Sequence, residues 1–182
     1  MRLLAVTAAT PPGALELLIG LGDGENGFGG TPVGRDPGKL DDWLDYCVHI
    51  ATAPPLSDDF VPQANYWITD ETGFVVGLVR IFPCINKALI NNGGHLGYYV
   101  APAYRRKGYG KAAFRLALDR LRIEGVRRAL VTVESHNIAS LSLVLALGGV
   151  EEDERIDDET GQAFRRFWLD TAYRTKIRRK AS

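Results

Sequence analysis

Hydrophobic positions along the chain follow two periods. Short, mostly apolar runs predict strands at 2–6, 63–69, 74–82, 95–100, 129–133 and 164–169. Apolar positions that recur every three or four residues predict helices at 14–19, 40–51, 110–124 and 138–147. The runs on either side of Asp70–Gly73 indicate a hairpin, and strand, helix, strand, helix and strand follow it. This order predicts an α/β domain with a mixed sheet.

Three segments add detail to this outline. The segment 20–38 holds eight glycines, which predicts a long flexible loop. The run 129–133 is nearly all apolar, as is typical of a buried strand in a parallel pairing. Asn137 is predicted to cap the helix at 138–147. Ala53–Pro55 is predicted to end the helix at 40–51.

Composition narrows the class of protein. The 182 residues are 46% hydrophobic and 24% charged, as in ordinary globular domains. Twenty-two basic residues balance 22 acidic ones, so no global charge favours nucleic acid. The basic segment 176–180 is interpreted as a solvated tail rather than a nucleic-acid arm.

The same composition indicates where the protein works. Its two cysteines, Cys47 and Cys84, are expected to be free thiols in a reducing compartment. No run approaches the roughly 18 apolar residues of a membrane span, and the first residues do not look like a signal peptide. We therefore expect a cytoplasmic protein without membrane or nucleic-acid partners. No residue grouping has the spacing of a metal site.

The loop after the 95–100 strand carries the clearest chemical signal. Three consecutive cations, 105–107, precede Gly108 and Gly110 at the start of a predicted helix. Free N–H groups and the helix dipole favour an anion there, and glycine lets the backbone approach a phosphate closely. The loop therefore predicts a pyrophosphate site.

Two other interpretations of this loop remain. In one, the glycines only form a turn and the cations are a solvated charge run. In the other, Gly108-x-Gly110-x-x-Ala113 is a dinucleotide fingerprint, with Glu134 after the next strand. Pro102 and several polar residues separate these glycines from the strand, which argues against a dinucleotide site. A P-loop is excluded because 105 is Arg and 112 is Ala.

At this loop the sequence resembles the GNAT acetyltransferases, whose signature [QR]-x-x-G-x-[GA] stands here as 105–110. A second match is Asn137-Ile138-Ala139-Ser140, which looks like the N-x-x-[AS] opening of the family's fourth helix. The resemblance runs from about Tyr66 to Leu169. A little-described branch of the superfamily is more similar still, on the segments Phe60-Val61-Pro62, Tyr66-Trp67, Gly93–Tyr98 and Leu147–Val150.

The resemblance implies a single domain over 1–182, with a mixed, mostly antiparallel sheet flanked by helices and a splayed central strand pair. Residues 60–170 form the expected acetyl-CoA-binding core, and 1–55 a variable region on the acceptor side. The residues expected to bind acetyl-CoA are Tyr98, Tyr99, Val100, Arg105, Arg106, Lys107, Gly108, Tyr109, Gly110, Lys111, Asn137 and Ser140.

The chemistry that the resemblance implies is direct attack of an amine on the thioester. The amine must be neutral to attack, so a general base is needed, and His95 and Glu134 are the candidates. The family's usual tyrosine acid falls at Val144, which has no proton to give. Three explanations remain, namely a different acid, protonation by solvent, or lost catalysis; Tyr98 and Tyr99 are the nearby phenols, and Tyr98 is the candidate acid. Each candidate also has an ordinary alternative: a packed tyrosine, a structural histidine and a solvated carboxylate.

The function predicted from the sequence is acetyl transfer from acetyl-CoA to a primary amine on a small molecule or a protein. Acidic residues at 151–154 and 157–159 are interpreted as a solvated hairpin rim, with attraction of a cationic amine as the alternative. Two other classes remain, a non-catalytic acyl-CoA sensor with this fold and an NAD(P)-dependent oxidoreductase. By analogy with the family, a homodimer is a further expectation.

Overall fold

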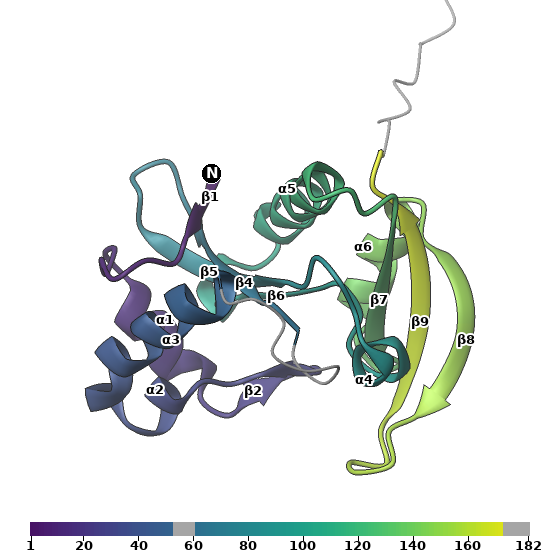
Figure 1. Ribbon diagram of the computed structural model, residues 1–182, viewed down its shortest axis with the longest axis horizontal. Helices are drawn as coiled ribbons and strands as arrows, with labels where there is room; N and C mark the ends of the chain where they lie inside the picture. Colours follow the sequence, from purple (N-terminus) through teal and green to yellow (C-terminus); the bar gives the residue numbers. More distant parts are fainter. Residues whose placement is uncertain (53–60, 173–182) are drawn as a thin grey trace, which may run out of the picture.

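The computed structural model describes residues 1–52 and 61–172. Seven strands form two antiparallel sheets, with the orders β1-β4-β5-β6 and β7-β9-β8. The first sheet consists of β1 (Arg2–Ala5), β4 (Ala64–Thr69), β5 (Val75–Ile81) and β6 (Leu96–Val100). The second consists of β7 (Arg128–Glu134), β8 (Val150–Ile156) and β9 (Ala163–Asp170). The two sheets stand beside each other, with β8 at the outer edge (Figure 1).

Helices cover both faces of the first sheet. On one side lie α1 (Ala14–Leu21), α2 (Pro32–Arg35), the 3-10 turn η1 (Pro37–Lys39) and α3 (Leu40–Thr52), with the short hairpin of β2 (Gly24–Glu25) and β3 (Phe28–Gly29). On the other lies α5 (Tyr109–Ile123), above the sheet in Figure 1, while α6 (Ile138–Ala146) stands against β7. The remaining elements are α4 (Lys87–Asn91) and the 3-10 turn η2 (Pro102–Tyr104).

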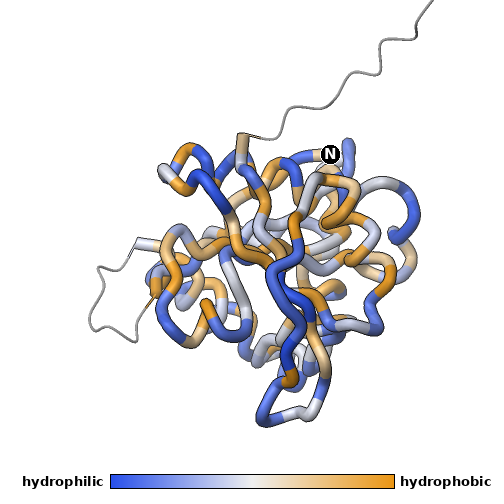
Figure 2. Tube along the Cα trace, turned by 90° about the vertical axis from the view of Figure 1, so that its right-hand side faces the viewer, coloured by the Kyte–Doolittle hydropathy of each residue, from blue (hydrophilic) through white to orange (hydrophobic). Residues whose placement is uncertain are grey.

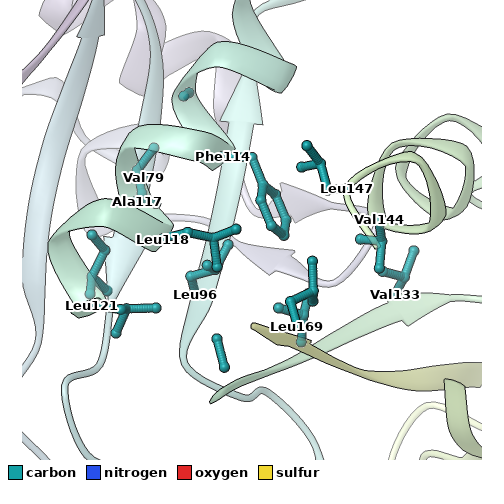
Figure 3. Close-up of a cluster of buried hydrophobic side chains, with 14 of the residues drawn as sticks. Val79, Leu96, Phe114, Ala117, Leu118, Leu121, Val133, Val144, Leu147 and Leu169 are labelled. Atoms are coloured by element: carbon teal, nitrogen blue, oxygen red, sulfur yellow. The ribbon is translucent and has the colours of Figure 1, made fainter. Parts of the chain in front are cut away.

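Two hydrophobic clusters hold these layers together. The larger one joins both sheets through α5 and α6, and Figure 3 shows Phe114 of α5 among side chains that include Val144 of α6 and Leu147 directly after that helix. The second lies under the N-terminal helices and includes Trp43 and Trp67. By contrast, the edge strand β8 is mainly polar and runs across the front of the view in Figure 2. In the described part of the chain, no helix has the length and apolar character needed to cross a membrane.

The elements predicted from the hydrophobic pattern are confirmed, each within two residues of its expected bounds. Asn137 caps α6 as expected, because its Oδ1 accepts a hydrogen bond from the N–H of Ser140 at 3.1 Å. The predicted helix break at 53–55, Phe60 and the basic tail at 176–180 lie outside the described residues.

The prediction of a long loop at 20–38 is wrong, because this segment contains β2, β3, α2 and η1. Its glycines serve close packing of backbone on backbone. A Cβ on Gly30 would lie 2.1 Å from the carbonyl oxygen of Gly22, and one on Gly34 would lie 2.4 Å from the same oxygen. Glycine is therefore required at both positions by space rather than by flexibility.

The parallel pairing expected for 129–133 is also wrong. β7 pairs antiparallel with β9, and among the described residues it meets the segment that leads into β6 through an isolated antiparallel bridge between Gly94 and Val131 and through hydrogen bonds between His95 and Leu130. The run is apolar because both of its faces are buried: Ala129, Val131 and Val133 belong to the larger cluster, and Leu130 on the other face is also fully buried. The sequence analysis also did not predict β8 or α4. The acidic residues 151–154 lie on β8, where Glu151 pairs with Arg165.

Candidate active site

The loop that enters α5 leaves backbone donors free for an anion. Gly108 precedes the helix with φ 87°, and no side chain caps the helix at this position. The first N–H groups of a helix have no acceptor within the helix, so they are available to a ligand. Arg106 also has a positive φ of 62°. This conformation aims consecutive N–H groups at one region of space, as at phosphate-binding helix starts.

The basic side chains of this loop are held in place by local contacts. Arg105 donates from Nε to the carbonyl oxygen of Val100 at 2.8 Å, and its Nη2 pairs with Glu25 at 2.5 Å. Its guanidinium lies 5.6 Å from the ring centre of Tyr99. Lys107 donates to the carbonyl oxygen of Ala103 at 2.9 Å. Arg105 is therefore fixed beside the end of β6, while Lys107 is turned back toward η2.

A cavity of about 680 Å³ lies between this loop and the start of α6. Ten of the twelve residues expected to bind acetyl-CoA line it, and Lys107 and Tyr109 do not. The lining residues that the sequence analysis did not select are Glu25, Asn26, Ile138, Ala139, Ser142 and Leu143. Glu25 and Asn26 belong to the glycine-rich segment, where no motif distinguished them. We call this space the donor cavity.

The open edge of β6 faces the gap between the two sheets. In an antiparallel pair the residues that bond to the neighbouring strand alternate with those that point away from it. The N–H of Ala101 bonds to Val76, and the carbonyl of His95 accepts from Phe82, so alternate residues of β6 face β5. The backbone groups of Tyr98 and the N–H of Val100 therefore point toward the gap, where an extended ligand can bond to them, while the carbonyl of Val100 already accepts from Arg105.

A second cavity, of about 440 Å³, meets the donor cavity at three shared residues, Tyr98, Asn137 and Ser140. The hydroxyl of Tyr98 lies 3.0 Å from Oγ of Ser140. Burial raises the pKa of Tyr98, so this phenol keeps its proton at neutral pH. A group that passes from one cavity to the other passes this hydroxyl pair.

Glu134 lines the second cavity from the end of β7. Its side chain is 20% exposed, and Oε2 lies 3.4 Å from Nε2 of His136. A Cβ on Gly27 would lie 3.7 Å from Oε1, so the hairpin of β2 and β3 covers this carboxylate closely. Glu134 is thus a partly buried carboxylate within the cavity, a position in which it can accept a proton from a bound amine.

The sequence matches the model of the acetyltransferase (GNAT) family over residues 35–148. The chain belongs to the GNAT acetyltransferase family. It is an acyltransferase by this membership, and its antiparallel sheets differ from the parallel βαβ units of a dinucleotide fold. A comparison with curated protein sequences finds no match.

Solved acetyltransferases have the same fold. A chimera of the Vibrio cholerae spermidine N-acetyltransferase SpeG and hSSAT has a TM-score of 0.66 at 18% identity, over 93% of this chain and 95% of that one. A dodecameric spermidine N-acetyltransferase from Vibrio cholerae has a TM-score of 0.62 at 17% identity, over 93% of each chain. A putative phosphinothricin N-acetyltransferase has a TM-score of 0.52 at 19% identity, over 71% of this chain and 78% of that one.

His95, the second candidate base of this acetyltransferase, lines neither cavity. Its N–H donates to the carbonyl of Leu130 at 2.7 Å, and its Nδ1 accepts from the N–H of Leu130 at 3.0 Å. A nitrogen that accepts an N–H carries no proton, and burial lowers the pKa of His95. His95 therefore links the start of β6 to β7. Unlike Tyr98 and Glu134, it is not part of the candidate site.

Val144, at the position of the family's usual acid, is fully buried. It belongs to the larger cluster and also lines the second cavity. A Cβ on Gly149 would lie 2.5 Å from a methyl group of Val144, so the chain at Gly149 packs directly against the valine. The acetyltransferase therefore has an apolar wall where its relatives are expected to carry a phenol.

Proposed function

We propose that this protein transfers an acetyl group from acetyl-CoA to the primary amine of an acceptor. The observation that carries the proposal is the meeting of two cavities at Tyr98 and Ser140. One cavity is lined by the phosphate-binding loop and the other by Glu134. The donor thioester would lie across the junction, with its pyrophosphate at Gly108 and its arm along the open edge of β6. The family match and the amine-acetylating structural neighbours support the same reaction class.

In the proposed reaction Glu134 takes a proton from the acceptor ammonium, directly or through water. The neutral nitrogen then attacks the thioester carbon, and a C–N bond forms as the C–S bond breaks. The backbone N–H of Tyr98 or Val100 stabilises the charge that develops on the thioester oxygen. The hydroxyl of Tyr98 is the proposed proton donor to the leaving thiolate, and the acylated nitrogen loses its remaining excess proton through solvent, which restores the phenol. Ser140, at 3.0 Å, is placed to orient it.

The donor is tested by thermal melting with acetyl-CoA, coenzyme A and NAD(P) in parallel. A ligand at 100 times its Kd stabilises a protein by about 2.7 kcal/mol. We expect stabilisation by both forms of coenzyme A and none by NAD(P). A shift with NAD(P) alone would overturn the proposal.

The base is tested with Glu134→Gln, assayed by thiol release with a panel of primary amines. Loss of a general base lowers kcat/KM by roughly 10²- to 10⁴-fold, and the deficit narrows at high pH, where the amine is already neutral. Glu154→Gln is the matched control, because Glu154 accepts a hydrogen bond from Ser135 and lines neither cavity. Equal activity of the two variants would remove Glu134 from the mechanism.

A non-catalytic acyl-CoA sensor is the second candidate, and buried Val144 favours it. Such a protein would be stabilised by acetyl-CoA and would release no thiol with any amine. Tyr98→Phe separates the two candidates further. It lowers kcat in an enzyme that uses this phenol as its acid and has no activity to lower in a sensor.

A further inference from the structure

Arg80 is a basic side chain in the wall of the second cavity that the sequence gave no reason to select. It lies on β5 opposite Gly97 of β6. Its Nη2 donates to the carbonyl of Gly30 at 3.0 Å, and its guanidinium lies 4.5 Å from the ring centre of Phe28. Arg80, Phe28 and Gly97 all line the cavity. The guanidinium is thus held by one carbonyl and one aromatic face at the edge of an enclosed space.

The positive charge of Arg80 has no negative partner among residues 1–52 and 61–172. Its Nε is buried without a hydrogen-bond partner, and burial lowers its pKa. The neighbouring thiol of Cys47 supplies no charge, because burial raises its pKa to about 12. Arg166, a buried arginine of the second sheet, has both Glu152 and Asp153 as partners. A partly buried cation without a counter-ion is costly, so an anion that enters the cavity relieves this cost.

The same cavity holds a carboxylate in a different part of its wall. The hairpin residues Gly27 and Gly29 connect the two charges, because a Cβ on Gly27 would lie 3.7 Å from Glu134 and one on Gly29 would lie 3.6 Å from Nη1 of Arg80. Asp157 also lines the cavity, but Thr160 and the N–H of Glu159 already bond to its carboxylate.

We infer that the acceptor is a small amine that also carries a carboxylate, as an amino acid does, with its ammonium at Glu134 and its carboxylate at Arg80. This inference rests on the proposed acetyl transfer. A guanidinium binds a carboxylate through charge-assisted hydrogen bonds, and the terminal nitrogens Nη1 and Nη2 of Arg80 carry N–H groups beyond the one that bonds to Gly30. A cavity of about 440 Å³ has the size of a small-molecule site. A polyamine, which has only positive charges, would meet Arg80 unfavourably.

The test compares each of the common L-amino acids with its own carboxamide, which keeps the amine and removes the anionic charge. Thiol release with saturating acetyl-CoA gives kcat/KM for each, and spermidine serves as the purely cationic probe. A hydrogen-bonded ion pair predicts that at least one amino acid exceeds its carboxamide by roughly 10- to 100-fold. In Arg80→Gln this ratio is expected to fall to about one.

The ratio does not depend on how much of the variant is folded, so a structural role of Arg80 alone leaves it unchanged. Arg80→Lys is the second variant, and it is expected to keep part of the preference because it keeps the charge but not the planar guanidinium. Arg120→Gln is the control: Arg120 lies over Tyr66, as Arg80 lies over Phe28, and lines neither cavity. It is expected to keep the full ratio.

Three results would overturn the inference: a ratio near one in the wild type, a ratio that survives in Arg80→Gln, and turnover of spermidine but of no amino acid. The melting experiment with acetyl-CoA separates these results from failure of the proposed acetyl transfer. If acetyl-CoA stabilises the protein in a melting experiment while no amino acid is acetylated, only the acceptor assignment fails. If acetyl-CoA does not stabilise the protein, the acetyl-transfer proposal fails with it.

Discussion

Gly108 and Gly125 form a matched pair for testing the donor site. They flank α5, with φ values of 87° and 86°, and a Cβ on either would meet nothing within 4 Å. Valine is strained in this left-handed conformation, at a cost of about 1–3 kcal/mol. For a domain of this size 1 kcal/mol lowers Tm by roughly 2–4 °C. Gly108→Val and Gly125→Val are therefore both expected to melt about 2–12 °C below the wild type.

Only Gly108 lines the donor cavity, so the two variants should differ in their response to acetyl-CoA. At 100 times Kd the ligand supplies about 2.7 kcal/mol, or roughly 5–11 °C, to the wild type and to Gly125→Val. A valine at 108 stands where phosphate must approach the backbone. If Kd rises 100-fold, the same concentration supplies about 0.4 kcal/mol to Gly108→Val, a shift of roughly 1 °C.

Scanning fluorimetry with and without acetyl-CoA measures both effects, and titration calorimetry gives Kd directly. Equal strain with unequal ligand response is the expected result. A Gly108→Val protein that retains the full ligand shift would refute the placement of the phosphates at the start of α5. A Gly125→Val protein that loses the shift would show that strain in α5, rather than contact with the ligand, controls affinity.

Three further predictions concern the fold. Native protein should show one reactive thiol, the exposed Cys84, and a second only after unfolding, because Cys47 is 2% exposed and burial raises its pKa to about 12; a thiol-reagent titration measures this, and two fast thiols would contradict it. The hydrogen bond from Arg166 lowers the pKa of Asp153 from 3.8 to about 2. The ionised carboxylate therefore stabilises the fold fully above about pH 4, and this stabilisation is lost as the pH falls through 2. Asp153→Asn should therefore be less stable than the wild type at pH 7 and approach it near pH 2, as followed by urea unfolding; a constant difference down to pH 2 would argue against the ion pair. Phe114→Ala, at a fully buried position, should cost about 3–5 kcal/mol in the same assay, and a loss below 1 kcal/mol would mean that the core refills the space.

The parts of the fold that sequence reasoning predicts are those in which local pattern and burial agree. The stripe from Phe114 to Leu121 on α5 is almost entirely buried, and its spacing alone predicts the helix. β8 could not be predicted in this way, because an edge strand with sequence VEEDERI is mostly exposed and shows no apolar period. The pairing of β7 was also beyond the sequence, because an apolar run reports burial and not the direction of its neighbour.

The two cavities also differ in how far the sequence alone can predict them. Most of the donor cavity comes from two continuous segments, 98–111 and 137–143, so a local motif identifies it. The second cavity combines residues from the N-terminal hairpin, β5, β6 and β7. Arg80 stands in an apolar run with no polar neighbour to distinguish it, and only the tertiary fold brings it beside Phe28. The place of Arg80 in the second cavity could therefore not be predicted from the sequence.

The two hydrogen bonds between His95 and Leu130 mark the point at which β6 and β7 diverge. β6 leaves β7 at this point, and its five residues run roughly 16 Å to Val100 at the donor cavity. A small rotation of β6 about His95 therefore moves Val100 further than it moves Leu96, and Val100 lies where the thioester is proposed to bind. Substitution of His95, which lines neither cavity, is therefore expected to change the spacing of β6 and β7 without altering a residue of either cavity wall.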